Sequence, residues 1–440
     1  MAKSKHSPTR AKSLDLFHEL REKYNTTQDI DLMPNTVTYN ATLSAFTKNA
    51  RKQDIKTAED LLKEMEQLYE EGSSNIKPDV FTLTNIISCY ANSNVDGAAE
   101  RAEDILNHMQ RLYEEGDFSM QPTKVAFGAV LNAWARVGDA ERAEAILNHM
   151  ESLQDGNEEM MANTVIYNTL INSWAKSKIK QRESGRRAEK ILRKMQSLQR
   201  NDAKPCRITF NSVLSAYNNS REVDAYFHAK GILQEMENNP DHNIQPDIVT
   251  YTTFLNIIAK WKNINEKVGL AEQILDRILA RKLQMNTFTY DAILRVCVYT
   301  NTSDPKVRRK ALVLAVKTFS EMQESYQFSP TSYSYSLFFN VISKHSSGNE
   351  QEKLLSHSLK DCCEAGMLTE STLSHLKEKF PSSIINTILV PSDSVENVQL
   401  HHLPSEWSCN ANKVDSSISR TAMRKTNRTV HNTGRRKNKG

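Results

Sequence analysis

The chain has 440 residues, of which 39% are apolar and 25% are charged, so it is able to bury an extended core. No apolar run approaches the roughly 20 residues that a membrane span needs, so no membrane-spanning helix is expected. The six cysteines include no C-x-x-C pair and mostly fall at apolar positions, as in reduced intracellular proteins. Residues 1–12 and 416–440 carry twelve basic and no acidic residues, so the net charge of +4 leaves −8 for the remainder. A broad positive field is therefore not expected.

Residues 1–33 are expected to form the second half of a helical repeat. Ser13, Phe17 and Leu20 follow one another at spacings of four and three, which places them on one helical face. No arginine-rich, acid-free presequence comes before them, so the sequence shows no targeting peptide.

From residue 34 one short phrase recurs eight times, as in V-T-Y-N-A-T-L from Val37 and V-T-Y-T-T-F-L from Val249. Its fourth residue, the register residue, returns every 39 to 45 residues. The register residues are Asn40, Thr84, Gly128, Asn168, Asn211, Thr252, Asp291 and Ser336. A near-fixed period of this length predicts tandem repeats of one small structural unit.

A second phrase lies between successive register residues, with alanine, an apolar residue four positions on, and usually methionine seven positions on. Its copies begin at Ala58, Ala102, Ala143, Ala188, Ala229, Ala271 and Ala315. Each repeat is thus expected to pair a first helix, which carries the register residue, with an antiparallel second helix. Apolar residues three and six positions after each register residue form a stripe that only stacked neighbours can bury.

The predicted fold class is all-α, an α-solenoid superhelix of tandem helix-turn-helix repeats. Eight repeats are expected over residues 34–366, followed by a C-terminal capping helix at 367–380. Residues 381–440 lose the periodicity and fill with serine, asparagine and charge. They are interpreted as a disordered basic tail.

This arrangement resembles the pentatricopeptide repeat family, helical solenoids that bind single-stranded RNA in mitochondria and plastids. The resemblance rests on P-N-T-V-T-Y-N from Pro34, K-P-D-V-F-T-L-T from Lys77 and Q-P-D-I-V-T-Y-T from Gln245, each followed by A-x-x-x-L-x-x-M. Tetratricopeptide repeats would need Trp and Gly early in the first helix and a period of about 34. The repeats here exceed the usual pentatricopeptide period, with extra residues such as 67–75 and 111–120, so longer second helices and loops are expected.

The resemblance implies that the register residue and the last residue of a repeat together read one RNA base. The implied pairs are Asn40 with Asp79, Thr84 with Thr123, Gly128 with Asn163, Asn168 with Cys206, Asn211 with Asp247, Thr252 with Asn286, and Asp291 with Thr331, while Ser336 has no assigned partner. Short amides, carboxylates and hydroxyls can hydrogen-bond the Watson–Crick edge of an unstacked base. By resemblance, the first and fifth pairs favour uracil and the sixth favours adenine, with the N-terminal repeats at the 5′ end of the RNA.

The family's base-stacking position maps to an apolar residue three positions before each register residue. These are Val37, Phe81, Val125, Val165, Ile208, Val249, Phe288 and Tyr333. A competing interpretation of the polar pairs is that Asn, Thr and Asp near a helix start serve as caps whatever the ligand. Their recurrence at one register in eight repeats favours base reading, because caps would tolerate more slippage.

Five of the eight residues that lie eight positions after a register residue are basic. They are Lys48, Arg136, Lys176, Lys260 and Lys344. Aligned on one flank of the first helices, they could follow a phosphate backbone. The alternative is that each is a solvated helix end, where lysine complements the helix dipole.

Neither a catalytic group nor a cofactor or metal site is expected. A zinc deaminase would need H-x-E with C-x-x-C, which the chain lacks, and His401 and His402 have no partners at ligand spacing. The predicted function is sequence-selective single-stranded RNA binding in organellar RNA processing, stability or translation, with RNA-processing or ribosomal proteins as further partners. The resemblance places such a protein in a mitochondrion or chloroplast. The alternative function is a protein-interaction scaffold, for instance on a mitochondrial ribosome.

Overall fold

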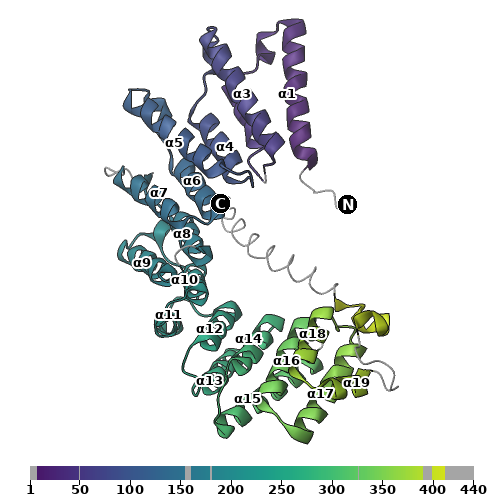
Figure 1. Ribbon diagram of the computed structural model, residues 1–440. Helices are drawn as coiled ribbons and strands as arrows, with labels where there is room; N and C mark the ends of the chain where they lie inside the picture. Colours follow the sequence, from purple (N-terminus) through teal and green to yellow (C-terminus); the bar gives the residue numbers. More distant parts are fainter. Residues whose placement is uncertain are drawn as a thin grey trace. The chain divides into compact units, whose positions relative to one another are not determined.

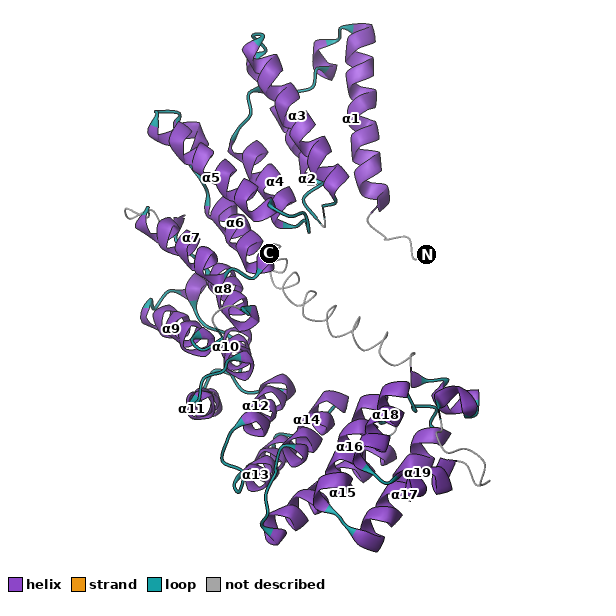
Figure 2. Ribbon diagram, viewed as in Figure 1, coloured by secondary structure: helices purple, strands orange, loops and turns teal. Residues whose placement is uncertain are grey.

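The computed structural model describes residues 7–48, 50–153, 160–178, 181–325, 327–389 and 399–411, and in these ranges it contains helices, turns and loops but no β-strand (Figures 1 and 2). The predicted all-α fold is therefore confirmed. The chain divides into two compact bodies. The N-terminal body comprises residues 1–222 and 239–244, and the C-terminal body comprises residues 223–238 and 245–440.

The N-terminal body is a row of helical pairs. It opens with α1 (Ser7–Thr27), has first helices α2 (Thr36–Ser44), α4 (Val80–Ala91), α6 (Lys124–Val137), α8 (Thr164–Lys176) and α10 (Arg207–Asn219), and has second helices α3 (Lys52–Glu70), α5 (Ala98–Glu114), α7 (Ala140–Ser152) and α9 (Ser184–Ser197). Each first helix packs against the next first helix. Each second helix packs between the first helices of its own and the following repeat, as in a solenoid.

The C-terminal body continues the pattern. It contains α11 (Ala225–Asn238), first helices α12 (Ile248–Lys260), α14 (Thr287–Val298) and α16 (Ser332–His345), second helices α13 (Lys267–Ala280), α15 (Pro305–Glu324) and α17 (Gly348–Glu364), and finally α18 (Glu370–Lys379) and α19 (Ser382–Leu389). The division falls inside the fifth repeat, whose first helix α10 belongs to one body and whose second helix α11 belongs to the other.

The two apolar stripes of the first helices form the core, as the periodicity predicts. The residues three positions after each register residue are at most 1% exposed: Leu43, Ile87, Leu131, Ile171, Leu214, Leu255, Leu294 and Phe339. Those six positions after it are also buried: Phe46, Tyr90, Trp134, Trp174, Tyr217, Ile258, Cys297 and Ile342. Burial of these stripes against neighbouring repeats supplies the hydrophobic stabilisation of each body.

The extra residues in the early repeats lengthen the second helices, as expected. Helices α3 and α5 have 19 and 17 residues, whereas α7 has 13. Gly72 and Gly116 follow the two long helices with φ of +103° and +104°, a left-handed conformation that glycine adopts without steric cost. The chain then forms short 3-10 turns in which Ile76 and Met120 are buried.

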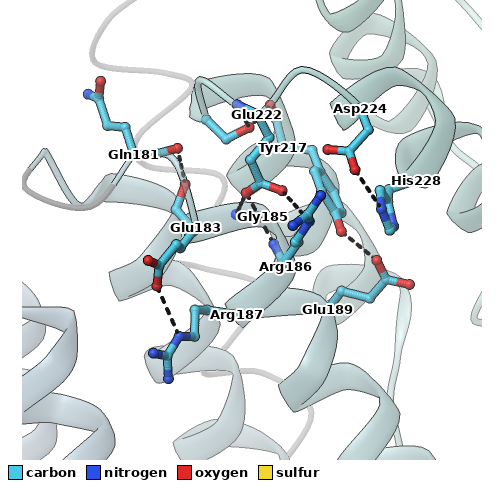
Figure 3. Close-up of polar contacts among 12 residues, drawn as sticks. Gln181, Glu183, Gly185, Arg186, Arg187, Glu189, Tyr217, Glu222, Asp224 and His228 are labelled. Atoms are coloured by element: carbon cyan, nitrogen blue, oxygen red, sulfur yellow. Dashed lines mark hydrogen bonds and ion pairs between the residues drawn. The ribbon is translucent and has the colours of Figure 1, made fainter.

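A carboxylate from a loop closes the start of helix α9 (Figure 3). Glu222, which follows α10, accepts hydrogen bonds from the backbone amides of Gly185 at 2.7 Å and Arg186 at 3.2 Å. The helix therefore receives its cap from the next part of the chain, because Glu183 makes no side-chain cap of its own. The Tyr217 ring packs directly over the Cα of Gly185, where no β-carbon would fit.

The interpretation of everything after residue 380 as disordered is wrong for part of that segment. Helix α19 packs on α17 and α18, and the backbone amide of Leu368 donates to the carbonyl of Trp407 at 2.9 Å. Four apolar residues are buried there: Ile385, Leu389, Leu403 and Ala411. The polar average of the segment concealed these short apolar runs. Residues 390–398 and 412–440 lie outside the described residues.

Candidate nucleic-acid interface

An exposed row of apolar side chains runs along the first helices. The second residue of every first helix is a large apolar residue, and its exposed fraction lies between 46% at Ile208 and 74% at Val37. The row comprises Val37, Phe81, Val125, Val165 and Ile208 in the N-terminal body, and Val249, Phe288 and Tyr333 in the C-terminal body. A regular row of exposed apolar side chains indicates a binding surface, since single scattered ones would be ordinary.

The register residues lie one helical turn further on. Each is the fifth residue of its first helix, three positions after the exposed apolar residue, so the two series share a face. Seven are half-buried, and Asp291 is only 6% exposed. The apolar row is therefore accompanied, one turn along, by a row of polar side chains and Gly128.

The second members of the proposed pairs are the N-cap residues of the following first helices. Six of the seven accept a hydrogen bond from a backbone amide in the first turn: Asp79, Thr123, Asn163, Asp247, Asn286 and Thr331. Cys206 holds the same position without such a bond. The capping interpretation is thus correct for these residues, whereas the register residues lie inside the helices.

The structure brings the first pair into direct contact. The side-chain amide of Asn40 donates to the carboxylate of Asp79 at 2.9 Å. The Thr82 hydroxyl lies 2.8 Å from the side-chain oxygen Oδ1 of Asn40 and 3.0 Å from the Asp79 carboxylate. One residue of α2 and two residues at the start of α4 therefore form a single polar cluster on the face beside Val37.

The sixth pair is connected through a third residue. The hydroxyls of Thr252 and Thr289 are 2.8 Å apart, and Thr289 donates to Asn286 at 3.1 Å. Sequence reasoning missed this third residue of the first helix, which is Thr or Ser in six of the eight repeats. This residue could have been found from the sequence, because a hydroxyl side chain recurs immediately before the aromatic or aliphatic residue of the repeated phrase.

The remaining five pairs differ in their hydrogen bonds and in their burial. Among the described residues no hydrogen bond joins Thr84 to Thr123 or Asn168 to Cys206, and one buried oxygen of Asn168 has no hydrogen-bond partner. Gly128 has no side chain to offer a base, although a β-carbon there would fit. Asn211 belongs to the N-terminal body and Asp247 to the C-terminal body. Asp291 and Thr331 are both buried, and Ser336 is half-buried.

The basic series has a mixed environment. Lys48, Arg136, Lys176, Lys260 and Lys344 are all exposed near the ends of first helices. Arg136 donates to the Asn94 side chain at 2.7 Å, and Lys344 donates to the Val298 carbonyl at 2.9 Å. Asparagines occupy the same position in two other repeats. Asn92 donates to the Thr47 carbonyl, just beyond the end of α2, and Asn219 donates to the Ala175 carbonyl at the end of α8. Residues at this position therefore often donate a hydrogen bond to a carbonyl at or just beyond the C-terminal end of the neighbouring first helix.

The described residues contain no group of three or more His, Cys, Asp or Glu side chains that could hold a metal ion. The same part of the chain includes no helix with the length and apolarity to cross a membrane.

Stacked helical pairs in this arrangement define a helical-repeat protein. Residues 153–220 and 231–300 match the family described as the pentatricopeptide repeat domain. These two stretches are therefore identified as pentatricopeptide repeats.

Two solved structures of a pentatricopeptide repeat protein are similar to this chain at low sequence identity. The crystal structure of the pentatricopeptide repeat protein PPR10 from maize is 20% identical with a TM-score of 0.44, covering 87% of this chain and 53% of that one. PPR10 in complex with an 18-nt psaJ RNA element is 19% identical with a TM-score of 0.38, covering 87% and 51%. The chain therefore spans about half the length of these proteins. No curated protein matches the chain.

Proposed function

We propose that this protein binds single-stranded RNA sequence-selectively and acts in organellar RNA processing, stability or translation. The observation that carries the proposal is the exposed apolar residue at the second position of every first helix, with the register residue one turn away. The match of residues 153–220 and 231–300 to the pentatricopeptide repeat domain supports the proposal. The protein is proposed to be non-enzymatic and to work in a mitochondrion or chloroplast.

The proposed mechanism separates affinity from selectivity. Unstacked bases insert between the exposed apolar side chains, which contribute about 1–3 kcal/mol per base where the side chain is aromatic and less where it is aliphatic. The register residue and the following N-cap residue then hydrogen-bond the base edge. Outside residues 1–12 and 416–440 the chain is net acidic. Base contacts are therefore expected to supply more of the affinity than a general attraction to phosphate.

The first pair provides the sharpest test of base reading. Asn40 with Asp79 is proposed to prefer uracil at the 5′ base position, and Asn40→Thr should shift that preference toward guanine, since a hydroxyl replaces the amide beside the carboxylate. The discrimination at stake is about 1–3 kcal/mol, by analogy with direct readout in DNA. The measurement is competition binding with four RNAs that differ only at this base.

The control is Asn107→Thr, the same substitution at an exposed position on the second helix α5. It should leave the base preference unchanged. If wild type and Asn40→Thr rank the four bases identically, the pair does not read the base.

A protein-interaction scaffold is the second candidate function. Arg136 and Lys344 already form hydrogen bonds within the chain, and residues 13–415 carry a net charge of −8. Incubation with a random single-stranded RNA pool, followed by sequencing of the retained molecules, separates the two. One enriched motif supports RNA reading, whereas no retention at low salt supports the scaffold.

A further inference from the structure

The side chain of Arg295 connects three consecutive first helices in the C-terminal body. It lies on α14 and donates to the Asn256 side chain on α12 at 2.5 Å and to the Tyr333 hydroxyl on α16 at 2.9 Å. Its guanidinium carbon is 5.7 Å from the centre of the Tyr333 ring, within the range of a cation–π interaction. Tyr333 is itself a member of the exposed apolar row.

Arginine is an exception at this position, which lies four residues after the register residue. The other seven repeats have short polar residues there: Ser44, Ser88, Asn132, Asn172, Ser215, Asn256 and Asn340. Serine and asparagine are too short to reach the aromatic residue of the next repeat. The contact between Arg295 and Tyr333 is therefore a property of the seventh repeat.

Both residues of the proposed seventh reading pair are also buried. Asp291 is 6% exposed and Thr331 is 7% exposed, whereas the residues of the other pairs are half-buried. The Asp291 carboxylate is hydrogen-bonded with Ser334, and its second oxygen, Oδ1, is buried without a hydrogen-bond partner in the described structure. A base edge could reach these groups only after the surrounding side chains moved.

We propose that the seventh base position is closed and that the RNA sequence read by this protein ends at the sixth repeat. Arg295 engages Tyr333, which would form one side of the seventh stacking site, and the reading groups behind it are buried. This inference rests on the proposed function, since it concerns which repeats of the same surface bind bases.

The test uses the RNA motif selected by the full-length protein, with a single abasic nucleotide placed at the fifth, sixth or seventh base position. Loss of a stacked base is expected to weaken binding at least about fivefold at the sixth position, which Phe288 flanks, and by a smaller but measurable factor at the fifth, which Ile208 and Val249 flank. At the seventh position the change should be less than about twofold. A loss at the seventh position equal to that at the sixth would overturn the proposal without any need for a variant.

Arg295→Asn installs the residue found in the sixth and eighth repeats and should open the site. In this variant the abasic nucleotide at the seventh position should cost at least about fivefold in affinity. Arg309→Asn is the charge-matched control, since Arg309 lies exposed on the second helix α15 and should keep the wild-type pattern. If the abasic nucleotide has no effect at any position, the proposed function itself is contradicted and this inference falls with it.

Discussion

The buried carboxylate of Asp291 is expected to make the folding stability of its repeat depend on pH. Its burial raises the pKa to about 6, while the Ser334 hydroxyl and the nearby Arg295 act in the opposite direction. An ordinary aspartate in an unfolded chain has a pKa of about 3.9. Folding therefore favours the protonated form, and the stability present below about pH 4 is lost as the pH rises through 6.

Asp291→Asn is expected to remove that loss. At pH 8 the variant should be more stable than wild type, by at most about 3 kcal/mol for a shift of roughly two pKa units, and the gain should vanish near pH 4. Denaturant unfolding of both proteins at pH 4 and pH 8 measures the difference. Asp276→Asn, at an exposed position on α13, should show no such pH dependence. An equal gain at both pH values would mean that ionisation of Asp291 is not its cause.

Gly185 supplies a second prediction at the level of one residue. A methyl group at this position would overlap the Tyr217 ring, so Gly185→Ala should destabilise the N-terminal body by about 1–3 kcal/mol despite the better helix propensity of alanine. Gly231→Ala is the matched control, because nothing lies near its missing β-carbon in α11. That change should stabilise by up to about 1 kcal/mol. Thermal unfolding followed by circular dichroism compares the two, and similar shifts for both would contradict the packing argument.

At the scale of the helix, polar contacts between repeats follow a rule that the sequence contained. Trp134 donates to Glu103 at 2.7 Å and Trp174 donates to Glu144 at 3.1 Å, each across to the second helix of the preceding repeat. Tyr90 and Tyr217 make the equivalent bonds to Glu59 and Glu189. Where the residue on the first helix is Phe46, Ile258 or Ile342, the matching residue is Leu14, Lys230 or Val316, whereas Cys297 is matched by Glu272. A buried indole or phenol needs an acceptor, so every Trp and Tyr of this series has a glutamate at the matching position.

Periodicity was sufficient to predict the helices and the buried stripes, because both depend on local spacing. It could not show that Glu222 caps α9 or that Arg295 reaches Tyr333, since these contacts depend on loop paths and on long side chains. For the candidate site, the exposed apolar row was predicted by resemblance. The sequence suggested capping only as an alternative to base reading, whereas the second member of each pair occupies the N-cap position in the structure.

The double role of Asp79 can be separated by substitution. Asp79→Ala should remove both the cap of α4 and the proposed uracil contact, with a loss of about 1 kcal/mol in helix stability. Asp79→Ser should keep most of the cap but lose the carboxylate. Hydrogen exchange at the Thr82 amide measures capping, and competition binding measures the base preference. Retention of uracil preference in Asp79→Ser would show that the carboxylate does not read the base.

At the scale of the whole molecule, the charge distribution limits how RNA could be held. Basic residues are concentrated outside the repeats, in residues 1–12 and 416–440, and the acidic remainder must rely on a few cations beside the apolar row. Lys48 and Lys176 have no hydrogen bond or ion pair to described residues, whereas Arg136 and Lys344 do. The first two are therefore expected to contribute most to any phosphate contact.

Replacing Lys48, Arg136, Lys176 and Lys260 by alanine should weaken binding to all RNA sequences alike. The dependence of log affinity on log salt should become shallower by up to about one unit for each lost phosphate contact. The control replaces four exposed lysines on second helices, Lys56, Lys63, Lys190 and Lys230, with the same change in net charge. If both quadruple variants lose affinity equally, the first-helix series has no special role and only net charge matters.

The contact between Asn40 and Asp79 bears on how such an array can be rearranged by recombination. A crossover in the loop before Pro78 would move Asp79 together with the helix it caps, but would leave Asn40 behind with the old neighbour. Every join made there would create a proposed reading pair with one residue from each parent. A crossover between the first and second helices would also separate Asn40 from Asp79, because α3 lies between them. Only a join between an N-cap residue and the next register residue, such as Asp79 and Thr84, keeps each proposed reading pair within one parent. Libraries of shuffled arrays should therefore be joined in the first turn of a first helix.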